Sequence, residues 1–597
     1  MKTKRITAIL LSVCLMCSFL AFGTSAKTVT KTAVYGDVDL DGRISIVDAT
    51  LIQKGLAKIK TLDETQTKAA NVDGSDSLGI NDATLIQKYL SKILTAFPVG
   101  ETFTYTTEVE ETDWRTSTIS YEIFVRSFYD SNGDGIGDFR GVAQKADYLK
   151  SLNVGCVWLM PIYKTTSYHG YDVVDYYSVN SELGTINDFD YMVQTLHDNG
   201  IKVIIDFVAN HTSSSNPWFT SAISSASSPY RDYYIIQSSK GSTGSWHKKN
   251  GVYYRGDFSS HMPELNFNNQ QVWTEIKNAA GYWLDRNIDG FRLDAAKHID
   301  DNTKVTHAWW RDFESYVKSK NSDAFVVGEV WSDTSAVIKY YSDMDSTFNF
   351  DLSTRIMNFA NGQSVDLVSA VNTCNTKYKN AASLTPDIPK TTIDSIFLNN
   401  HDQTRTVSTL GDSVEKAKLA AAVEMTLPGM PFIYYGEELG QKSNTSDPNR
   451  REAMDWYKSA SGTGMCNSRK WDTTPKYTVA NDGISLEEEI NDKNSLYNYY
   501  VSLTTIRNNY PIFFEGDYNT VTTSSNIYSY TVTKQDSDYG MFVAHNNTSS
   551  SVTVKASVPF TDLLSGKSYS AGDSVTINGY SSLIVNYTGS DNTYRPF

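Results

Sequence analysis

Cysteine is scarce in this chain of 597 residues, which has only five, two of them within the first 26 residues. The three others, Cys156, Cys374 and Cys466, cannot form a disulfide framework for so long a chain, so stability must come from hydrophobic cores. Cys156 falls within the apolar run Val154–Leu159, which predicts a buried thiol and not a reactive one.

Positive charge is also in short supply. The chain has 53 Lys and Arg against 68 Asp and Glu, a net charge of −15, which argues against a nucleic-acid partner. The 40% hydrophobic content is that of an ordinary globular protein. Aromatic residues are plentiful, with 38 Tyr, 25 Phe and 11 Trp. Their flat apolar rings suit protein cores and also stacking on flat polyhydroxylated ligands.

Residues 1–26 have the pattern of a secretion signal. Lys2, Lys4 and Arg5 precede the apolar stretch Ile6–Phe22, and the small residues Thr24-Ser25-Ala26 follow it. This order predicts export and cleavage after Ala26, with no membrane attachment afterwards; an uncleaved anchor is the alternative.

A repeat with an offset of 34 residues follows the signal. Residues 48–54, Asp-Ala-Thr-Leu-Ile-Gln-Lys, recur unchanged at 82–88. Two copies cannot form a helical solenoid, which needs at least three. Each copy continues into an apolar helical stripe, Leu51/Ile52/Leu56/Ile59 and Leu85/Ile86/Leu90/Ile93.

Oxygen-bearing residues precede each copy at the spacing of a calcium loop. The first loop, 37–48, has Gly42 at position 6. The second loop, 71–82, has Asp76 there, which predicts weaker binding. The candidate ligands are Asp37, Asp39, Asp41, Arg43, Asp48, Asn71, Asp73, Ser75 and Asp82. Arg43 would bind through its backbone carbonyl.

Residues 34–95 therefore resemble a dockerin, a duplicated calcium-binding module. The resemblance implies binding to a cohesin domain of a scaffold protein, commonly through loop positions 10 and 11, here Ile46-Val47 and Ile80-Asn81. A calcium-stapled domain without a partner is the alternative. Residues 96–112 are predicted to be a linker.

Residues 113–211 and 271–505 alternate strand-like and helix-like segments. Eight apolar runs rich in β-branched residues predict strands of a (β/α)8 barrel; a doubly wound sheet is the alternative. The runs are Ile119–Val125, Val154–Met160, Ile201–Val208, Gly290–Leu293, Phe325–Val330, Ser346–Phe350, Ser395–Leu398 and Pro431–Tyr435.

Polar residues gather just after several of these runs. Because the carboxyl ends of barrel strands meet on one face, Asp294, Glu329 and Asp402 are expected to converge. Arg292, two residues before Asp294, predicts an ionised nucleophile, and the apolar surroundings of Glu329 predict a protonated general acid. That pairing is the chemistry of retaining glycoside hydrolysis.

Four ordered segments resemble the α-amylase family of glycoside hydrolases: Asp206–His211, Gly290–His298, Val327–Trp331 and Phe397–Asp402. The resemblance implies Asp294 as nucleophile, Glu329 as acid/base and Asp402 as transition-state stabiliser. It also implies an inserted domain at 212–270. The sugar-binding residues it suggests are His169, Tyr171, Asp172, His211, Arg292, Lys297, His298, His401 and Arg405.

A third run of alternating oxygen donors and glycines follows the first strand. Its spacing predicts a calcium site, which relatives also carry there. The candidate ligands are Asp130, Asn132, Asp134, Ile136 and Asp138. Asn210 also matches a calcium ligand of many amylases, but partner carboxylates for it are not identifiable.

Residues 506–597 are rich in Val, Tyr, Ser and Thr and predict a C-terminal antiparallel β-sandwich. Simple packing on the barrel is favoured over starch binding because no exposed aromatic pair stands out.

The sequence as a whole predicts a secreted α-amylase that cleaves α-1,4 bonds within starch or maltodextrins and is held on a scaffold, extracellularly or at the cell surface. Asp172 and Arg405 resemble an ion pair of exo-acting relatives, so a neopullulanase-like or oligo-α-glucosidase enzyme is the runner-up. A transglycosylase and a catalytically inactive carbohydrate-binding protein are further alternatives.

Overall fold

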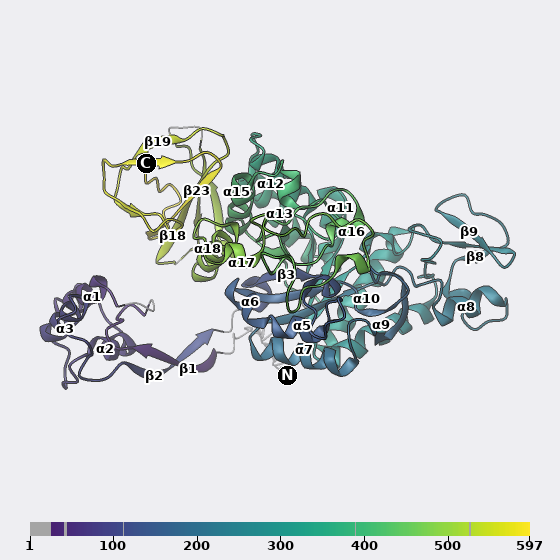
Figure 1. The fold of residues 1–597 in the computed structure, drawn as a ribbon, viewed down its shortest axis with the longest axis horizontal. Helices are drawn as coiled ribbons and strands as arrows, with labels where there is room; N and C mark the ends of the chain where they lie inside the picture. The colour runs from purple at the N-terminus through teal and green to yellow at the C-terminus, as the bar shows by residue number, and fades with distance from the viewer. Residues whose placement is uncertain (1–25, 41–43, 111–112, 389, 524–526, 536) are drawn as a thin grey trace, which may run out of the picture. The chain divides into compact units, whose positions relative to one another are not determined.

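The computed structural model describes residues 26–40, 44–110, 113–388, 390–523, 527–535 and 537–597. The predicted signal lies outside these residues except for Ala26. The chain divides into two compact units, residues 1–112 and 113–597, each of which is described by itself (Figure 1). Within the described ranges, no helix has the length and apolar character needed to cross a membrane.

Eight parallel strands form the barrel of the larger unit. They are β3 (Ile119–Ile123), β4 (Val154–Leu159), β7 (Lys202–Phe207), β11 (Gly290–Leu293), β12 (Phe325–Gly328), β13 (Ser346–Thr347), β14 (Ser395–Phe397) and β15 (Met430–Tyr434). Their order is β13-β12-β11-β7-β4-β3-β15-β14, and a bridge between Phe348 and Ser395 closes the ring. Each strand lies on one of the eight predicted runs, so the (β/α)8 prediction is confirmed.

Apolar side chains fill the barrel and pack the surrounding helices against its strands. Trp158, Phe325, Phe348 and Phe432 pack inside together with Cys156, whose thiol is fully buried as predicted. The surrounding helices include α5 (Phe139–Gln144), α6 (Ala146–Ser151), α7 (Ile186–Asp198), α9 (Gln270–Leu284), α10 (Thr303–Lys320), α12 (Phe350–Ala360), α13 (Leu367–Ala382), α15 (Val414–Thr426) and α18 (Leu496–Asn509).

Two smaller substructures complete this unit. The inserted segment 212–270 contains α8 (Pro217–Ser224) and the sheet β8 (Ile236–Gln237), β10 (Val252–Arg255) and β9 (Trp246–Lys249). The C-terminal region has the antiparallel sheet β16 (Asp517–Thr520), β17 (Tyr528–Thr533), β18 (Tyr539–Asn546) and β23 (Ser581–Thr588), with the pairs β19 (Val552–Lys555)–β22 (Ser574–Ile577) and β20 (Phe560–Thr561)–β21 (Ser568–Tyr569). The predicted antiparallel architecture is confirmed.

The smaller unit contains α1 (Ile46–Leu56), α2 (Glu64–Ala70) and α3 (Ile80–Leu90). The predicted linker at 96–112 is wrong over most of its length, because β2 (Thr102–Glu110) pairs antiparallel with β1 (Ala26–Val34) over nine residues. The two strands flank the duplicated helices in the sequence. Each strand lacks a partner close in sequence, so local patterning did not reveal the ladder.

Glu424, near the C-terminal end of α15, is a fully buried carboxyl group. Neither of its oxygens has a hydrogen-bond partner among the described residues. Burial raises the pKa of Glu424 well above its ordinary value, with a further contribution from Glu437. The folded chain therefore keeps a proton that the unfolded chain releases above the ordinary pKa, so stability falls as pH rises.

We expect Glu424→Gln to flatten this decline, because the amide has no charge to bury. The contribution to the slope is about 1.4 kcal/mol per pH unit between the two pKa values. Denaturant midpoints at pH 5 and pH 8 measure it. Glu415→Gln, in the exposed first turn of the same helix, is the control and should keep the wild-type slope. Equal slopes for Glu424→Gln and wild type would contradict the explanation.

Candidate active site

A buried guanidinium organises the acidic residues at the carboxyl ends of β7, β11 and β12. Arg292 on β11 is completely buried. Its Nη1 donates to Asp294 Oδ1 at 2.8 Å and to both carboxylate oxygens of Asp206 at 3.0 Å. Its Nη2 lies 3.0 Å from Glu329 Oε2. Asp294 and Glu329 therefore converge as predicted, at the two terminal nitrogens of one guanidinium.

The backbone after Asp294 also holds Glu329. Ala295 adopts a left-handed conformation, φ +45°, which is uncommon for a residue with a Cβ and frequent at functional sites. Its N–H donates to Glu329 Oε2 at 2.9 Å, and the N–H of Ala296 donates to the Glu329 carbonyl. The turn after β11 thus positions the carboxylate that follows β12.

Asp402 lies between two cations. Arg451 Nη2 is 2.8 Å from its Oδ1, and His401 Nε2 is 3.1 Å from its Oδ2. The second ring nitrogen of His401 contacts Glu122 of β3. Although burial opposes the charge on His401, Asp402 and Glu122 raise the pKa of this imidazole to about 10. Burial likewise opposes the charge on Asp402, but His401 and Arg451 hold the pKa of this carboxyl well below its ordinary range.

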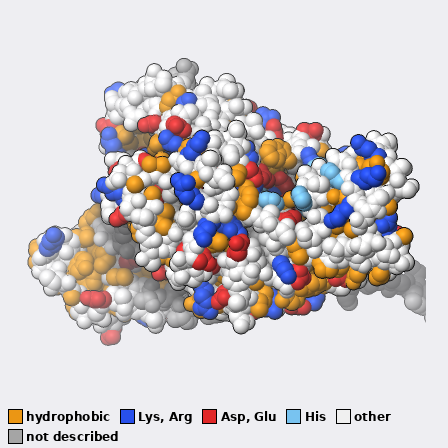
Figure 2. Space-filling model, turned by 45° about the vertical axis from the view of Figure 1, so that its right-hand side comes forward, with side chains coloured by type: hydrophobic (Ala, Val, Ile, Leu, Met, Phe, Trp, Pro, Cys, Tyr) orange, Lys and Arg blue, Asp and Glu red, His pale blue; other side chains and the backbone are white. Residues whose placement is uncertain are grey.

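Asp294, Glu329 and Asp402 line one cavity of 280 Å³. Figure 2 shows a hollow on this face with acidic side chains in it and histidines beside it. The other lining residues are His169, Tyr171, His211, Phe258, Ser259, Met262, Ala295, Asp447 and Arg451. The cavity thus combines three carboxyl groups with aromatic rings, as a sugar site requires.

Tyr171 and His211 are locked in place at the cavity wall. The Tyr171 hydroxyl lies 3.0 Å from Asp206 Oδ2 and 2.6 Å from His401 Nε2, and its ring stacks on that of His401. His211 Nε2 is 3.1 Å from the Tyr171 carbonyl, and burial lowers the pKa of this imidazole to about 4. His211 is therefore neutral at physiological pH.

The expected ion pair of Asp172 and Arg405 is wrong. Asp172 accepts hydrogen bonds from Thr165, Thr166, Ser167 and Ser213. The buried Arg405 donates to the carbonyls of Tyr435 and Arg450 and lies over the rings of Tyr434 and Tyr435. Neither side chain lines the cavity, and each has partners other than the predicted one.

Four other predicted sugar contacts also lie outside the cavity lining: Arg292 and His401, which contact the acidic residues of the cavity, and Lys297 and His298. Lys297 Nζ donates to the Trp331 carbonyl at 2.5 Å. The backbone carbonyl of His298 accepts a hydrogen bond from Asn210, and the His298 ring lies 5.3 Å from the Phe258 ring. Both residues follow Asp294 on the exposed turn η3 (Ala296–His298), which explains their place at the rim.

Several cavity residues were not among those predicted from the sequence. Arg451 and Asp447, 3.1 Å apart, come from the loop after β15, and Phe258, Ser259 and Met262 come from the inserted segment. Two adjacent arginines, Arg450 and Arg451, after the last barrel strand are a signal that could have revealed the first pair. No such signal marks Phe258, Ser259 and Met262. They belong to the inserted segment, which lies outside the strand pattern in the sequence and folds back over the barrel.

Burial raises the pKa values of both Asp294 and Glu329, and Arg292 opposes the rise in each case. The prediction that Arg292 alone would keep Asp294 ionised was therefore too simple. Asp294 accepts an N–H from Arg292, whereas the contact of Glu329 with Arg292 Nη2 is not a hydrogen bond. Asp294 thus accepts a hydrogen bond from a cation, whereas Glu329 accepts its hydrogen bond from the neutral N–H of Ala295, so the negative charge is better stabilised on Asp294 and a proton on Glu329.

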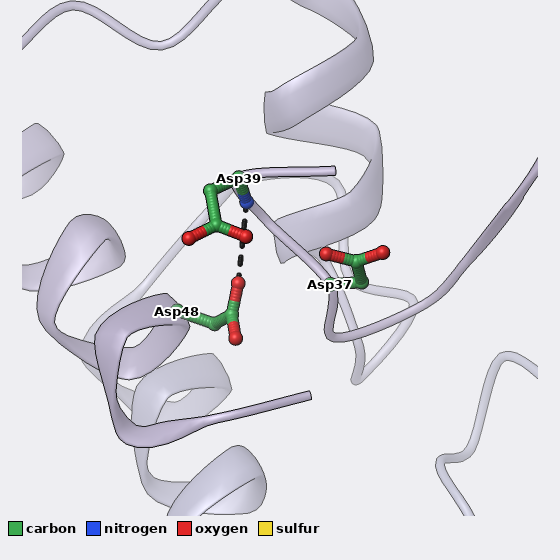
Figure 3. A group of neighbouring side chains, drawn as sticks. All are labelled: Asp37, Asp39 and Asp48. Carbon is green, nitrogen blue, oxygen red and sulfur yellow. Dashed lines mark hydrogen bonds between the residues drawn. The ribbon is translucent and has the colours of Figure 1, made fainter. Parts of the chain in front are cut away.

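Asp37, Asp39 and Asp48 are suited to hold a cation. Their ligand oxygens all lie within 4.8 Å of one another, and among the residues that the structure describes they are the one such group of three acidic side chains (Figure 3). Asp48 Oδ1 also accepts from Asp39 N. The remaining predicted ligands of this loop, Asp41 and Arg43, lie outside the described residues.

The other two predicted loops are closed by their own hydrogen bonds. Asp82 repeats the position of Asp48, accepting from the N–H groups of Val72 and Asp73. Unlike the first loop, the second loop has its other carboxylate bonded within the loop: Asp73 accepts hydrogen bonds from Asn81 and Ser75. The hydrogen bond from Asn81 lowers the pKa of Asp73 to about 2. Asn71 bonds to the Ser75 carbonyl.

In the 130–138 loop, side-chain oxygens accept mainly from the loop's own backbone. Asp130 accepts from Gly133 and Gly135, Asn132 from Asp134, and Asp134 from Ile136. Asp138 accepts from Ser131 and Gly141. Oxygen donors are therefore gathered there, without a tight group of three carboxylates among the described residues.

Comparison with known proteins identifies the class. Residues 122–516 match the α-amylase catalytic domain, and residues 35–91 match the dockerin type I domain. The chain therefore belongs to the α-amylase family of glycoside hydrolases and has a dockerin domain near its N-terminus.

Its relatives have several activities. The chain is 44% identical to α-amylase 3 of Dictyoglomus thermophilum, over 66% of this chain and 77% of that protein. It is 35% identical to a 4-α-glucanotransferase of Thermotoga maritima, over 65% and 87%. A crystal structure of an α-amylase from H. orenii superposes with a TM-score of 0.69 at 36% identity, covering 79% of this chain and 99% of that one.

We expect Arg451→Gln to reduce kcat/KM by roughly 10²-fold, because Asp402 loses one of the two cations that keep it ionised. The pKa of Asp402 should rise, so the acid limb of the pH–rate profile should move to higher pH. Arg469→Gln, on the exposed turn η5 (Ser468–Lys470), is the control. An unshifted acid limb with reduced activity would contradict this role for Arg451.

Proposed function

We propose that the chain is a secreted, scaffold-attached α-amylase that hydrolyses internal α-1,4 bonds of starch and maltodextrins with retention of configuration. One observation supports this most strongly: Asp294 and Glu329 meet on the guanidinium of Arg292 in a cavity that Asp402 also lines. A nucleophile and an acid so close together match double displacement, in which no water fits between them in the first step.

In this proposal, the Asp294 carboxylate attacks the anomeric carbon while Glu329 gives its proton to the departing glycosidic oxygen. Glu329, now ionised, then takes a proton from water, which attacks the same carbon and releases Asp294. Asp402, kept anionic by His401 and Arg451, stabilises the positive charge that develops on the sugar. The neutral His211 and the ring of Tyr171 orient the sugar.

The absence of an ion pair between Asp172 and Arg405 favours endo attack over exo attack. The resemblance to exo-acting relatives depended on an ion pair between them, and each is held by other partners. A 4-α-glucanotransferase remains the second candidate, because such an enzyme is 35% identical and uses the same kind of intermediate. A product time course on amylose separates the two: hydrolysis raises the number of reducing ends, whereas transfer leaves it constant.

The roles of Asp294 and Glu329 predict different responses to leaving-group ability. Asp294→Asn should lower turnover of both starch and an α-maltosyl fluoride by roughly 10⁴-fold or more. Glu329→Gln should lower kcat/KM for starch by about 10³-fold but largely spare kcat/KM for the fluoride, because this parameter reports the first step, in which fluoride departs without protonation. Glu275→Gln, on α9, serves as control. Equal losses on both substrates for Glu329→Gln would exclude it as the general acid.

We further propose that the dockerin domain binds calcium and a cohesin of an extracellular scaffold. Exposed apolar side chains gather on this small unit, as expected of a protein-binding surface. Ile46, Val47 and Ile80, at loop positions 10 and 11, are 57%, 51% and 61% exposed. Asp37, Asp39 and Asp48 supply the hard oxygen ligands that calcium prefers. Asp130, Asn132, Asp134, Ile136 and Asp138 are proposed ligands of a separate calcium in the barrel unit.

Asp48→Asn should weaken calcium binding by the full chain by roughly tenfold or more, since a carboxylate ligand is lost. Calorimetric titration measures the affinity, and starch hydrolysis should be unchanged because Asp48 belongs to the other unit. Asp63→Asn, at the N-cap of α2 outside the loops, is the control. Unchanged calcium binding by Asp48→Asn would refute the assignment of the first loop.

A further inference from the structure

One wall of the cavity comes from the loop 256–263 of the inserted segment. Three of the lining residues lie on this loop, and Phe258 is the largest of them. Phe258 is 48% exposed, and its ring lies 5.3 Å from the rings of both His211 and His298. An apolar ring therefore faces the cavity that holds the three carboxyl groups, and such a ring is suited to stack on a sugar.

Backbone hydrogen bonds close this loop and attach its second half to the start of the inserted segment. The N–H of Glu264 donates to the carbonyl of Arg255 at 3.0 Å, which closes the base of the loop. Ser214 N donates to the His261 carbonyl at 2.8 Å. These bonds hold the loop to its own segment, so the half that carries Phe258 depends on other contacts for its position over the barrel.

The side chain of Arg255 supplies such a contact, because it joins the base of the loop to the barrel. Its Nη1 and Nη2 donate to the two carboxylate oxygens of Asp301 at 2.6 Å and 2.7 Å. Asp301 lies between η3 and α10, on the connection that follows the nucleophile strand β11. Nearby, Asn268 of the inserted segment donates to Asp300 at 2.7 Å.

The same guanidinium also holds both ends of the loop. Its Nη2 donates to Asp257 Oδ2 at 2.6 Å, and its Nε lies 3.0 Å from Glu264 Oε2. Three carboxylates thus share one planar cation, which fixes their relative orientation. The loop is tightly folded beside this cation, since a Cβ on Gly256 would lie 2.7 Å from the Ser259 carbonyl oxygen. A shift at the base is therefore transmitted to Phe258.

We propose that Arg255 is a positioning residue for substrate binding: by clamping the base of the loop 256–263 to Asp301, it holds Phe258 at the cavity wall and sets the affinity for the α-glucan. Arg255 does not itself line the cavity, so it acts through the loop. This inference rests on the proposed function and deepens it, because it places a determinant of KM outside the cavity.

The test compares Arg255→Gln with wild type in the full chain, with maltoheptaose as substrate. We expect KM to rise by roughly tenfold and kcat to stay within about twofold, because substrate binding must then order the loop while the catalytic carboxyl groups keep their own cations. Arg231→Gln is the control, since Arg231 of the same inserted segment donates to the Ala222 carbonyl and should leave KM unchanged. A wild-type KM for Arg255→Gln would overturn the inference, whereas a wild type that turns over no α-glucan would refute the proposed function itself.

Asp301→Ala tests the clamp from the barrel side and serves where Arg255→Gln fails to fold. Asp301 is exposed, and its removal leaves the contacts of Arg255 with Asp257 and Glu264 in place. KM should rise as in Arg255→Gln, and the double variant should be little worse than either single one, because both changes break the same contact. An unchanged KM for Asp301→Ala, or additive effects in the double variant, would contradict the clamp.

Discussion

The active site depends on one buried cation. Arg292 has no solvent contact, and its charge is matched only because Asp206, Asp294 and Glu329 surround it. A guanidinium is always charged and offers its donors in a fixed plane, so it sets the distance and orientation of carboxylates that come from three different strands. Lysine could supply the charge there but not the geometry.

A second, separate charge cluster supports the first. His401 joins Glu122 of β3 to Asp402, and Arg451 joins Asp402 to the loop after β15. Because the barrel closes on itself, the charged residues that follow its last strands lie beside the site that the middle strands form. Burial favours the neutral form of all three carboxyl groups: it raises the pKa values of Asp294 and Glu329, whereas at Asp402 the paired cations outweigh it and keep the group ionised.

Much of this architecture was predictable from the sequence, because a parallel barrel strand is buried on both faces and reads as a continuous apolar run. Residues directly after such runs, such as Asp294 and Glu329, were predictable for the same reason. The ion pair between Asp172 and Arg405 was predicted wrongly, because a resemblance in sequence does not show which residues a charged side chain contacts. Arg451 was missed because a long loop returns it to the site. Phe97 and Phe103 read as linker residues because their partners lie in β1 and in the repeated helices, beyond the reach of local patterns.

In the proposed mechanism, Asp294 becomes covalently attached to the sugar. A 5-fluoro maltosyl fluoride slows release of the intermediate enough for peptide mass analysis of the full chain. We expect a single labelled peptide that contains Asp294, and a label that decays when maltose is added as acceptor. Label on Glu329 or Asp402, or turnover of this substrate with no covalent species, would contradict it.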